Sequence, residues 1–466
     1  MPQNITRRRF LRQVNCAAIS ALPILNTLLN LKLAGNVAAA TTGNTDYKAL
    51  VCIFLAGGCD TFNILVPTGA EYSDYATIRG PVALSQDTLL PLNSTAQSST
   101  PLGLNPALTN IQQLFNAGNA AYVTNVGTLI QPVTKDEYNN GTISLPLGLY
   151  SHSDQQEQWQ TSTPDIRSAH GWGGRAADIL QSLNTLNTVS MNISLTGQNI
   201  WQCGNNSYVY TVNNTGAVPL DGYDPTNTDP WSALPIRTQA VNSQLALQYQ
   251  HLLTQAFNNS KNDAMAAYTL FNSATSGALP SSVTFPANSY FSSNMQMVAK
   301  AIAGAPSMGQ NRQTFFIEYD GWDTHDNLIA TQASLLPDVD ATLAAFYNCL
   351  VAMGLQNNVT VFTISDFART LTSDGGGTDH AWGGNHLVLG GAVNGGQVYG
   401  QYPSLYANNP LDVGRGRIIP QIAVDSYFAE LALWFGVSPS SLSQVLPNIG
   451  NFYNTSSGTP PVGFMA

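Results

Sequence analysis

Residues 49–55, Ala-Leu-Val-Cys-Ile-Phe-Leu, form a continuous apolar run that ends just before Gly57 and Gly58. An apolar run without polar alternation is typical of a strand with both faces buried, as in the middle of a parallel sheet. Asp60 follows shortly after this predicted strand, at the kind of position where open α/β sheets bind ligands. The stretch therefore predicts the fold class and one edge of a binding site.

Strand and helix patterns alternate along the rest of the chain. Further strands are expected at 120–126, 189–195, 313–319, 359–364 and 386–389, and helices at 105–115, from about 154, 172–183, 334–353 and 422–435. This alternation predicts an α/β fold with a parallel or mostly parallel sheet. Residues 200–235 are rich in Asn, Thr, Pro and Gly, and a long helical pattern follows over 236–273. We expect residues 41–466 to form a single α/β domain, with about 200–305 as a loop and helical insertion.

The first 40 residues have the pattern of an export signal. Thr6-Arg7-Arg8-Arg9-Phe10-Leu11-Arg12 has the form of a twin-arginine motif, an apolar segment runs from about Val14 to Leu33, and Ala38-Ala39-Ala40 offers a cleavage site. The alternatives are a basic helix end before a core helix, and an uncleaved membrane anchor, which the polar residues of the segment disfavour. We predict a mature chain that begins near Thr41. It would pass through the twin-arginine translocase, reside in the periplasm or outside the cell, and keep no stable membrane span.

The charge of the chain disfavours a nucleic-acid partner. Removing the five basic residues of the predicted signal from a total of 17 leaves 12 against 27 acidic residues, a net charge of −15. Binding to a phosphate backbone requires a basic face, which such a balance does not supply. The four cysteines outside the signal form no C-x-x-C pair, which argues against a zinc ribbon or a redox motif.

Histidine and aspartate gather between residues 320 and 386. Three of the six histidines lie there, in a chain with only 9% charged residues. Asp60, Asp323 and Asp366 each follow a predicted strand, so in a parallel sheet all three would converge where the carboxyl ends of the strands meet. Imidazole and carboxylate together can hold a divalent metal or transfer protons. For any single aspartate, capping of the following helix is the alternative.

Several motifs around these residues resemble those of one bacterial exported family. Residues 55–67, Leu-Ala-Gly-Gly-Cys-Asp-Thr-Phe-Asn-Ile-Leu-Val-Pro, are similar to the first motif of the domain-of-unknown-function 1501 family. The resemblance runs from about Lys48 to Phe452 and includes Ser151-His152 with Gln155 and Trp159, residues 171–175, 321–325, 365–370, 378–386 and 423–425, Trp434-Phe435-Gly436 and Leu446-Pro447-Asn448. The family resembles the alkaline phosphatase and sulfatase superfamily, which implies a three-layer sandwich with helices on both faces of a mostly parallel sheet.

The resemblance also implies a set of metal ligands at the strand ends. The residues at the ligand positions are Asp60, Asp323, His325, Asp366 and His380. They would hold one or two divalent ions, with Zn, Mn, Mg and Ca all left open. Phe367 stands where the superfamily has a histidine, so one nitrogen ligand would be missing.

Catalytic roles are expected for Ser151, His152 and Arg369. Ser151 precedes a predicted helix, whose dipole would favour a nucleophilic hydroxyl and an anionic substrate, and capping of that helix is the alternative. His152 could be a ligand, a base or a core histidine. Arg369 could neutralise substrate oxygens or form a structural ion pair.

The sequence thus predicts an exported, metal-dependent hydrolase that acts on a small anionic ester, either a phosphate or a sulfate. The alternative is a non-catalytic exported binding or surface protein that keeps a retained or degenerate metal site on the same scaffold. Phe367 and the open choice of nucleophile favour that alternative.

Overall fold

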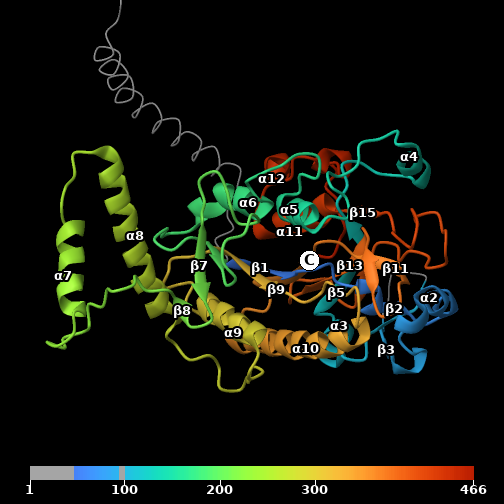
Figure 1. Ribbon diagram of the computed structural model, residues 1–466, viewed down its shortest axis with the longest axis horizontal. Coiled ribbons are helices and arrows are strands. Elements are labelled where there is room, and N and C mark those ends of the chain that lie inside the picture. The colour runs from blue at the N-terminus through green and yellow to red at the C-terminus, as the bar shows by residue number, and fades with distance from the viewer. Residues whose placement is uncertain (1–46, 94–99) are drawn as a thin grey trace, which may run out of the picture.

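The computed structural model describes residues 47–93 and 100–466 (Figure 1), so the predicted export signal lies outside the described residues. Within the described part, helix α10 (Leu328–Met353) is long and apolar enough to cross a membrane by length and composition. However, 56% of its apolar window is buried, and the helix packs against α9 (Tyr290–Ala303) and α3 (Thr109–Asn116). It therefore serves here as a core helix.

A ten-stranded sheet forms the middle layer of the molecule. Its strands, in spatial order, are β14 (Gln397–Tyr399), β5 (Ala120–Gly127), β13 (Gly384–Leu389), β10 (Val359–Ser365), β1 (Lys48–Leu55), β9 (Arg312–Tyr319), β6 (Asn192–Ser194), β7 (Val209–Asn213) and β8 (Gly216–Ala217), with β15 (Ile422–Ala423) also paired to β5. Neighbouring strands run parallel, except where β13 meets β10 and β5 and where β8 meets β7. The prediction of a mostly parallel sheet is confirmed.

The central position of β1 explains its apolar sequence. Alternate side chains from Ala49 to Leu55 belong to the core on one face of the sheet, and those from Leu50 to Phe54 belong to the core on the other face. Complete burial of one large aliphatic or aromatic side chain stabilises a fold by about 1.5–3 kcal/mol. In the parallel register, Leu55 pairs with Tyr319 of β9 and with Ser365 of β10. The three strands therefore end side by side, as the sequence predicts.

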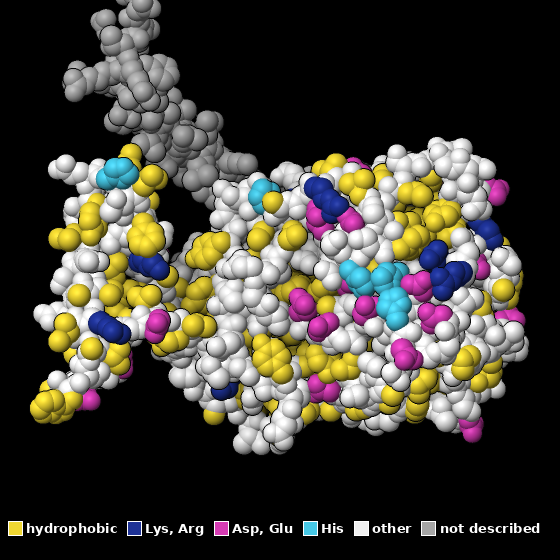
Figure 2. Space-filling model, in the orientation of Figure 1, with side chains coloured by type: hydrophobic (Ala, Val, Ile, Leu, Met, Phe, Trp, Pro, Cys, Tyr) yellow, Lys and Arg dark blue, Asp and Glu magenta, His cyan; other side chains and the backbone are white. Residues whose placement is uncertain are grey.

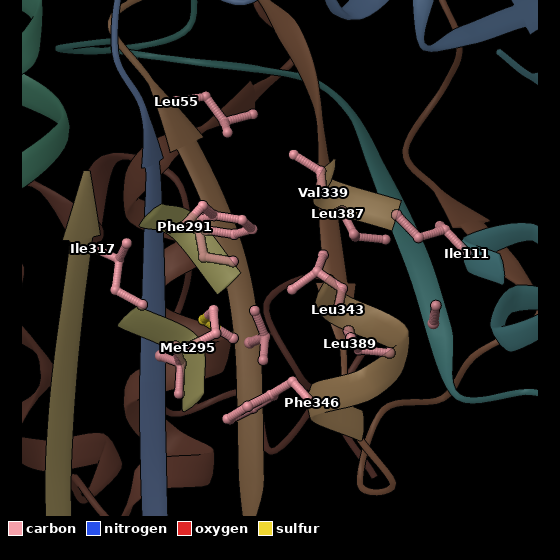
Figure 3. Close-up of a cluster of buried hydrophobic side chains, with 14 of the residues drawn as sticks. Leu55, Ile111, Phe291, Met295, Ile317, Val339, Leu343, Phe346, Leu387 and Leu389 are labelled. Carbon is pink, nitrogen blue, oxygen red and sulfur yellow. The ribbon is translucent and has the colours of Figure 1, made fainter. Parts of the chain in front are cut away.

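Helices cover both faces of this sheet, which confirms the predicted three layers (Figure 1). One face is covered by α5 (His152–Thr161), α6 (Trp172–Leu180), α11 (Val424–Phe435) and α12 (Leu442–Val445), and the other by α3, α9 and α10. Figure 3 shows part of the second core, where Phe291 of α9 and Phe346 of α10 pack with Ile317 of β9. The apolar faces of these helices hold the strand ends at fixed positions.

Only part of the segment 200–305 lies outside the sheet and the helices that cover it. Helices α7 (Leu234–Leu245) and α8 (Leu252–Thr275) form an arm at one end of the molecule (Figure 1). By contrast, β7 extends the sheet beside β6, and α9 packs against α10 in a helical layer.

The prediction of a single helix from 236 to 273 is wrong, because the chain turns between α7 and α8. Polar side chains of α8 bind the backbone at the turn: Oε1 of Gln255 accepts from the amide of Tyr249 at 2.7 Å, and Nδ2 of Asn258 donates to the carbonyl of Leu245 at 3.0 Å. These bonds supply partners that a continuous helix would otherwise provide.

A short hairpin follows β10 and was not predicted. It consists of β11 (Arg369–Ser373) and β12 (Thr378–His380), which pair antiparallel. Gly377 allows the hairpin to approach the loop after β9, since a Cβ at this position would lie 2.3 Å from the carbonyl carbon of His325. The hairpin thereby brings His380 to the carboxyl edge of the sheet.

Candidate metal centre

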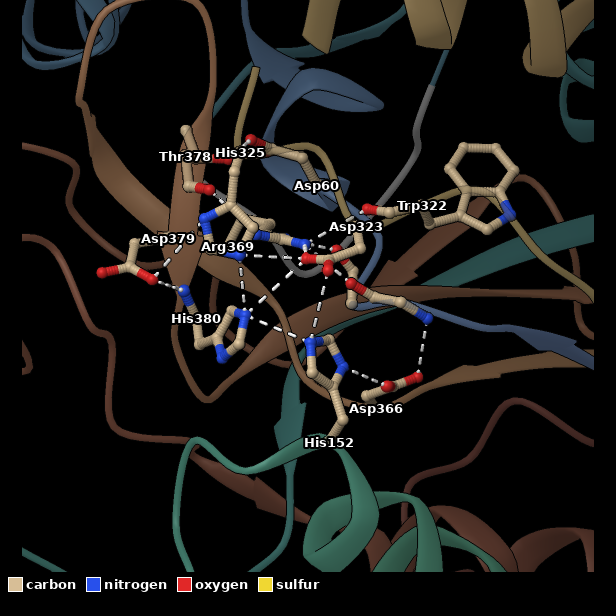
Figure 4. A network of polar contacts seen from close by, with 12 residues as sticks. Asp60, His152, Trp322, Asp323, His325, Asp366, Arg369, Thr378, Asp379 and His380 are labelled. Atoms are coloured by element: carbon tan, nitrogen blue, oxygen red, sulfur yellow. Dashed lines mark hydrogen bonds and ion pairs between the residues drawn. The ribbon is translucent and has the colours of Figure 1, made fainter. Parts of the chain in front are cut away.

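Four side chains from three parts of the chain meet at the carboxyl edge of the sheet (Figure 4). His152 is the first residue of α5, Asp323 and His325 lie in the loop after β9, and His380 ends β12. Their side chains are between 22% and 47% exposed, so the cluster is open to solvent. Figure 2 shows histidine side chains gathered on this face, with acidic and basic groups beside them.

The nitrogen and oxygen atoms of the four side chains face one another at short distances. Nε2 of His380 lies 3.1 Å from Nε2 of His152 and 2.9 Å from Nε2 of His325. The Asp323 carboxylate lies 3.1 Å from Nε2 of His325 and 3.6 Å from Nε2 of the other two histidines. Ligand atoms around a tetrahedral ion with bonds of about 2.0–2.1 Å are about 3.3 Å apart. The spacing of His152, Asp323 and His380 therefore fits a metal ion, and His325 and Asp379 form a second group of this kind with His380.

Hydrogen bonds at the opposite ring nitrogens fix two of the histidines. Nδ1 of His152 lies 2.7 Å from Oδ2 of Asp366, and Nδ1 of His380 lies 2.9 Å from the carbonyl oxygen of Tyr150. Because both oxygens accept, each Nδ1 carries the hydrogen, and Nε2 of the neutral ring presents a lone pair. Two lone pairs that face each other repel unless a cation lies between them. The residues thus fit a bound metal ion.

The charges around the cluster favour the protonation states that a metal needs. Burial lowers the pKa of His380 below its ordinary value, and the nearby His152, Arg369 and His325 add to this effect, although the bond to Tyr150 opposes it. Partial burial raises the pKa of Asp323, but the hydrogen bond and the charge of Arg369 outweigh it, so the pKa of Asp323 is lowered. A neutral imidazole and an ionised carboxylate are the ligand forms of these groups.

Asp366 lies behind the cluster instead of inside it. Its side chain is fully buried, and Oδ1 accepts from the amide of Gly57 at 3.0 Å, while Oδ2 accepts from Gln156 at 2.9 Å and from His152. A carboxylate that holds the far nitrogen of a ligating histidine orients the ring and raises its basicity. The prediction of Asp366 as a direct ligand is therefore corrected to a supporting role for His152.

Asp60 is also removed from the ligand set. It is 1% exposed, and its Oδ2 forms a buried ion pair with Arg79 of α2 (Tyr72–Arg79) at 2.6 Å. The same oxygen accepts from the Thr378 hydroxyl at 2.9 Å. Thr378 begins the strand that ends in His380, so the bond from Thr378 to Asp60 fixes the hairpin to the loop after β1. The sequence correctly placed Asp60 at the strand ends, but it did not reveal the partner arginine.

Arg369 has a structural position in place of the predicted contact with substrate. Its side chain is fully buried and donates to the carbonyl oxygens of Gly57, Gly58 and Thr378, each at 2.8 Å. It also forms an ion pair with Asp323. Because all of its nitrogens bond to protein oxygens, Arg369 joins the loop after β1 to the hairpin and orients Asp323.

The turn before α5 is strained where it serves the cluster. Tyr150 has a φ of 74°, a conformation that costs a bulky residue about 1–3 kcal/mol. This conformation turns the Tyr150 carbonyl toward His380 and places His152, two residues later, in the same cluster. The strain therefore lies at the residue that helps to position both His152 and His380.

Ser151 is the N-cap residue of α5, but its side chain makes no capping hydrogen bond. Its hydroxyl lies 3.3 Å from that of Ser153. Among the described residues, no Ser, Thr or Cys side chain hydrogen-bonds to the four clustered side chains. The Ser151 side chain hydrogen-bonds to the Asp154 carboxylate, so the predicted nucleophile contacts Asp154 and Ser153 but none of the four clustered side chains.

His152 lies beside Phe367 in the cluster. The Phe367 ring packs against both His152 and His380, with centroid distances of 4.8 and 4.5 Å. The sequence left the role of His152 open, because its approach from α5 depends on tertiary packing. His386 is buried against Trp159, on the face of the sheet covered by α5 and α11, and burial lowers its pKa to about 3.

The model of the family described as protein of unknown function DUF1501 matches residues 47–414. The chain belongs to this family. No curated protein matches the chain. The DUF1501 match covers β1 and all four residues of the cluster.

Among solved structures, similarity is found at low identity. A crystal structure of Ps i-CgsB in complex with k-i-k-neocarrahexaose is 9% identical, with a TM-score of 0.34, and the match covers 84% of this chain and 72% of that one. The PsFucS1 sulfatase from Pseudoalteromonas sp. is 10% identical, with a TM-score of 0.31 and coverage of 79% and 68%.

Proposed function

We propose that the protein is a metal-dependent hydrolase of phosphate or sulfate esters. The observation that carries this proposal is the convergence of Nε2 atoms from His152, His325 and His380 on the Asp323 carboxylate, with two of the rings fixed from behind. Three imidazoles with one carboxylate suit Zn, and to a lesser degree Mn, better than Mg or Ca, which prefer oxygen ligands. We accordingly narrow the expected metal to Zn or Mn.

The residues around the centre have different supporting roles. A bound metal would polarise a phosphoryl or sulfuryl oxygen and make water a stronger nucleophile. Asp366 orients His152, the Tyr150 carbonyl orients His380, and Arg369 holds Asp323 in its ionised form. Since the cluster is open to solvent, an ester carried on a large molecule has access to it. We expect water, and not Ser151, to attack.

A non-catalytic metal-binding protein is the second candidate function. The lack of a hydroxyl or thiol bonded to the cluster, among the described residues, favours it over a phosphatase with a serine nucleophile. The two functions differ in turnover and agree in metal content.

Metal analysis with an ester screen tests the proposal. We expect about one Zn or Mn per chain and turnover of aryl phosphate or aryl sulfate esters. Asp323→Ala and His380→Ala should lose both, whereas His251→Ala, which changes an exposed histidine at the start of α8, should keep both. Protein without bound metal, and without thermal stabilisation by added Zn or Mn, would contradict the proposal.

Two further outcomes separate the alternatives. Bound metal without turnover of any ester supports the non-catalytic function. Loss of turnover in Ser151→Ala, with metal content unchanged, would restore Ser151 as the nucleophile.

We further propose that residues 41–466 form the exported mature chain and fold as one domain. Substitution of Arg8 and Arg9 by lysine should block export through the twin-arginine translocase. Cell fractionation tests this, because a chain that still reaches the periplasm would have used another route.

A further inference from the structure

The turn between residues 412 and 418 presents two arginines beside the cluster. Oδ1 of the buried Asp412 accepts from the amides of Gly414 and Gly416, each at 2.8 Å, which closes the turn tightly. The carbonyl oxygen of Gly416 accepts from the amide of Leu371 in β11 at 3.1 Å. The turn is thus fixed on the hairpin that carries His380.

Arg417 is held against two residues of the metal centre. Its Nε donates to the carbonyl oxygen of His380 at 3.1 Å, and its guanidinium lies over the ring of Tyr150, 4.6 Å from the centroid. The stacked guanidinium is oriented by these contacts before any ligand arrives. Beyond them, one η nitrogen lies 4.0 Å from the Asp379 carboxylate, a distance too long for a hydrogen bond. Donors of Arg417 therefore stay available at the rim of the cluster, where its side chain is 26% exposed.

Arg415 forms an ion pair with the carboxylate of Asp379. Its Nη1 lies 2.7 Å from Oδ2 of Asp379. The turn and its neighbour Asp379 thus contribute two guanidinium groups and one carboxylate. Arg369 cannot supply a further guanidinium to a substrate, because protein oxygens occupy its nitrogens.

We propose that Arg417, with Arg415 behind it, binds the tetrahedral anionic group of the substrate at the metal centre. A planar guanidinium can donate two parallel hydrogen bonds to the oxygens of phosphate or sulfate. Arg415 satisfies Asp379, which would otherwise repel the anion. The inference rests on the proposed function, and it identifies the residue that would select anionic over neutral esters.

Titration calorimetry with inorganic phosphate and with inorganic sulfate tests the proposal on the zinc-loaded full chain. Arg417→Gln should weaken anion binding at least tenfold, and Arg417→Lys should weaken it less because the charge remains. Arg237→Gln is the matched control, since Arg237 is exposed on α7, in the arm at the far end of the molecule (Figure 1). It should change the affinity by less than twofold. The anion that the wild-type protein binds with the higher affinity identifies the preferred ester class.

Elemental analysis and thermal unfolding of each variant show whether weaker anion binding is caused by loss of zinc or by loss of the fold. We expect the same zinc content and unfolding midpoint in Arg417→Gln as in wild type. Unchanged anion affinity in this variant would overturn the inference, as would wild-type protein that binds neither anion. Loss of zinc from Arg417→Gln would also overturn it, because the arginine would then act on His380. The metal content and ester turnover of the wild type test the proposed function separately.

Discussion

Nε2 of His152 lies 3.1 Å from Nε2 of His380, and Nδ1 of each ring faces an acceptor oxygen, of Asp366 and of the Tyr150 carbonyl respectively. Neither ring in its neutral form can donate to the other, so the contact is repulsive without a cation. In a cluster with only a structural role, a hydrogen-bond donor on one side chain would be expected to face an acceptor on the other. This pair is therefore the strongest reason to expect a metal.

Metal binding should stabilise the fold. Zinc at about 100 times its Kd should raise the free energy of unfolding by about 2.7 kcal/mol, provided that it binds only the folded chain. His325→Ala should remove most of this gain, because it deletes one of four ligands, while His251→Ala should keep it. Urea unfolding with and without zinc measures the difference. Equal stabilisation of the His325→Ala variant would show that zinc binds elsewhere.

Asp366→Asn should weaken metal binding without removing a ligand. Loss of a carboxylate behind a ligating histidine typically lowers metal affinity by about 10–100-fold. The amide can still accept from Nδ1 of His152, so the ring should stay in place but become less basic. A competition titration with a zinc chelator gives the affinity, with Asp263→Asn on the exposed face of α8 as the control. An affinity equal to that of wild type would speak against the orienting role.

Arg369→Met should destabilise the protein. The substitution leaves the carbonyls of Gly57, Gly58 and Thr378 without their donor and Asp323 without its ion pair. Leaving one buried hydrogen-bonding group without its partner costs about 1–3 kcal/mol, whereas loss of the ion pair with the half-exposed Asp323 adds little. Urea unfolding provides the measurement.

The matched control for that experiment is Arg167→Met, which removes an exposed arginine and should cost less than about 1 kcal/mol. If Arg369→Met were as stable as wild type and changed only KM, the arginine would instead contact the substrate.

Asp425 should make the stability depend on pH. Burial raises the pKa of its carboxyl from 3.8 to about 7 in the folded chain. Between these values the folded state keeps a proton that the unfolded state has lost, so stability is highest below pH 3.8 and falls as the pH rises through 7. The slope is about 1.4 kcal/mol per pH unit for one group.

Asp425→Asn is neutral at every pH and should remove this slope. It should be more stable than wild type above pH 7, with the difference disappearing near pH 4. Urea unfolding at several pH values, with Asp263→Asn as an exposed control, measures it. Parallel pH profiles for wild type and Asp425→Asn would refute the buried ionisation.

The sequence predicted the sheet well because the central strands are apolar on both faces. The run from Ala49 to Leu55 has no polar position, and such a run fits only the middle of a sheet. The turn between α7 and α8 was missed because it contains no Gly or Pro and depends on side chains six or more residues away, such as Gln255. Contacts of this kind join residues in different turns of the chain, so a local sequence pattern does not reveal them.

The predicted site residues lie at one edge of the sheet, but only three of the five predicted metal ligands are in the cluster. Asp323, His325 and His380 lie together, because strand ends and loops follow from topology. Asp60 and Asp366 follow strands in the same way, yet their partners, Arg79 and His152, come from distant segments. A carboxylate at a strand end can face the site or the residue behind it, and only packing decides between the two.

The assembly of the centre from distant segments has a consequence for folding. An ion held by His152, Asp323 and His380 would be a cross-link that closes chain loops of 171 residues, from 152 to 323, and 57 residues, from 323 to 380. Closing loops of this length in an unfolded chain costs several kcal/mol of entropy, so the unfolded chain would hold the ion poorly. Capture of the metal would then report that both halves of the sheet have already come together.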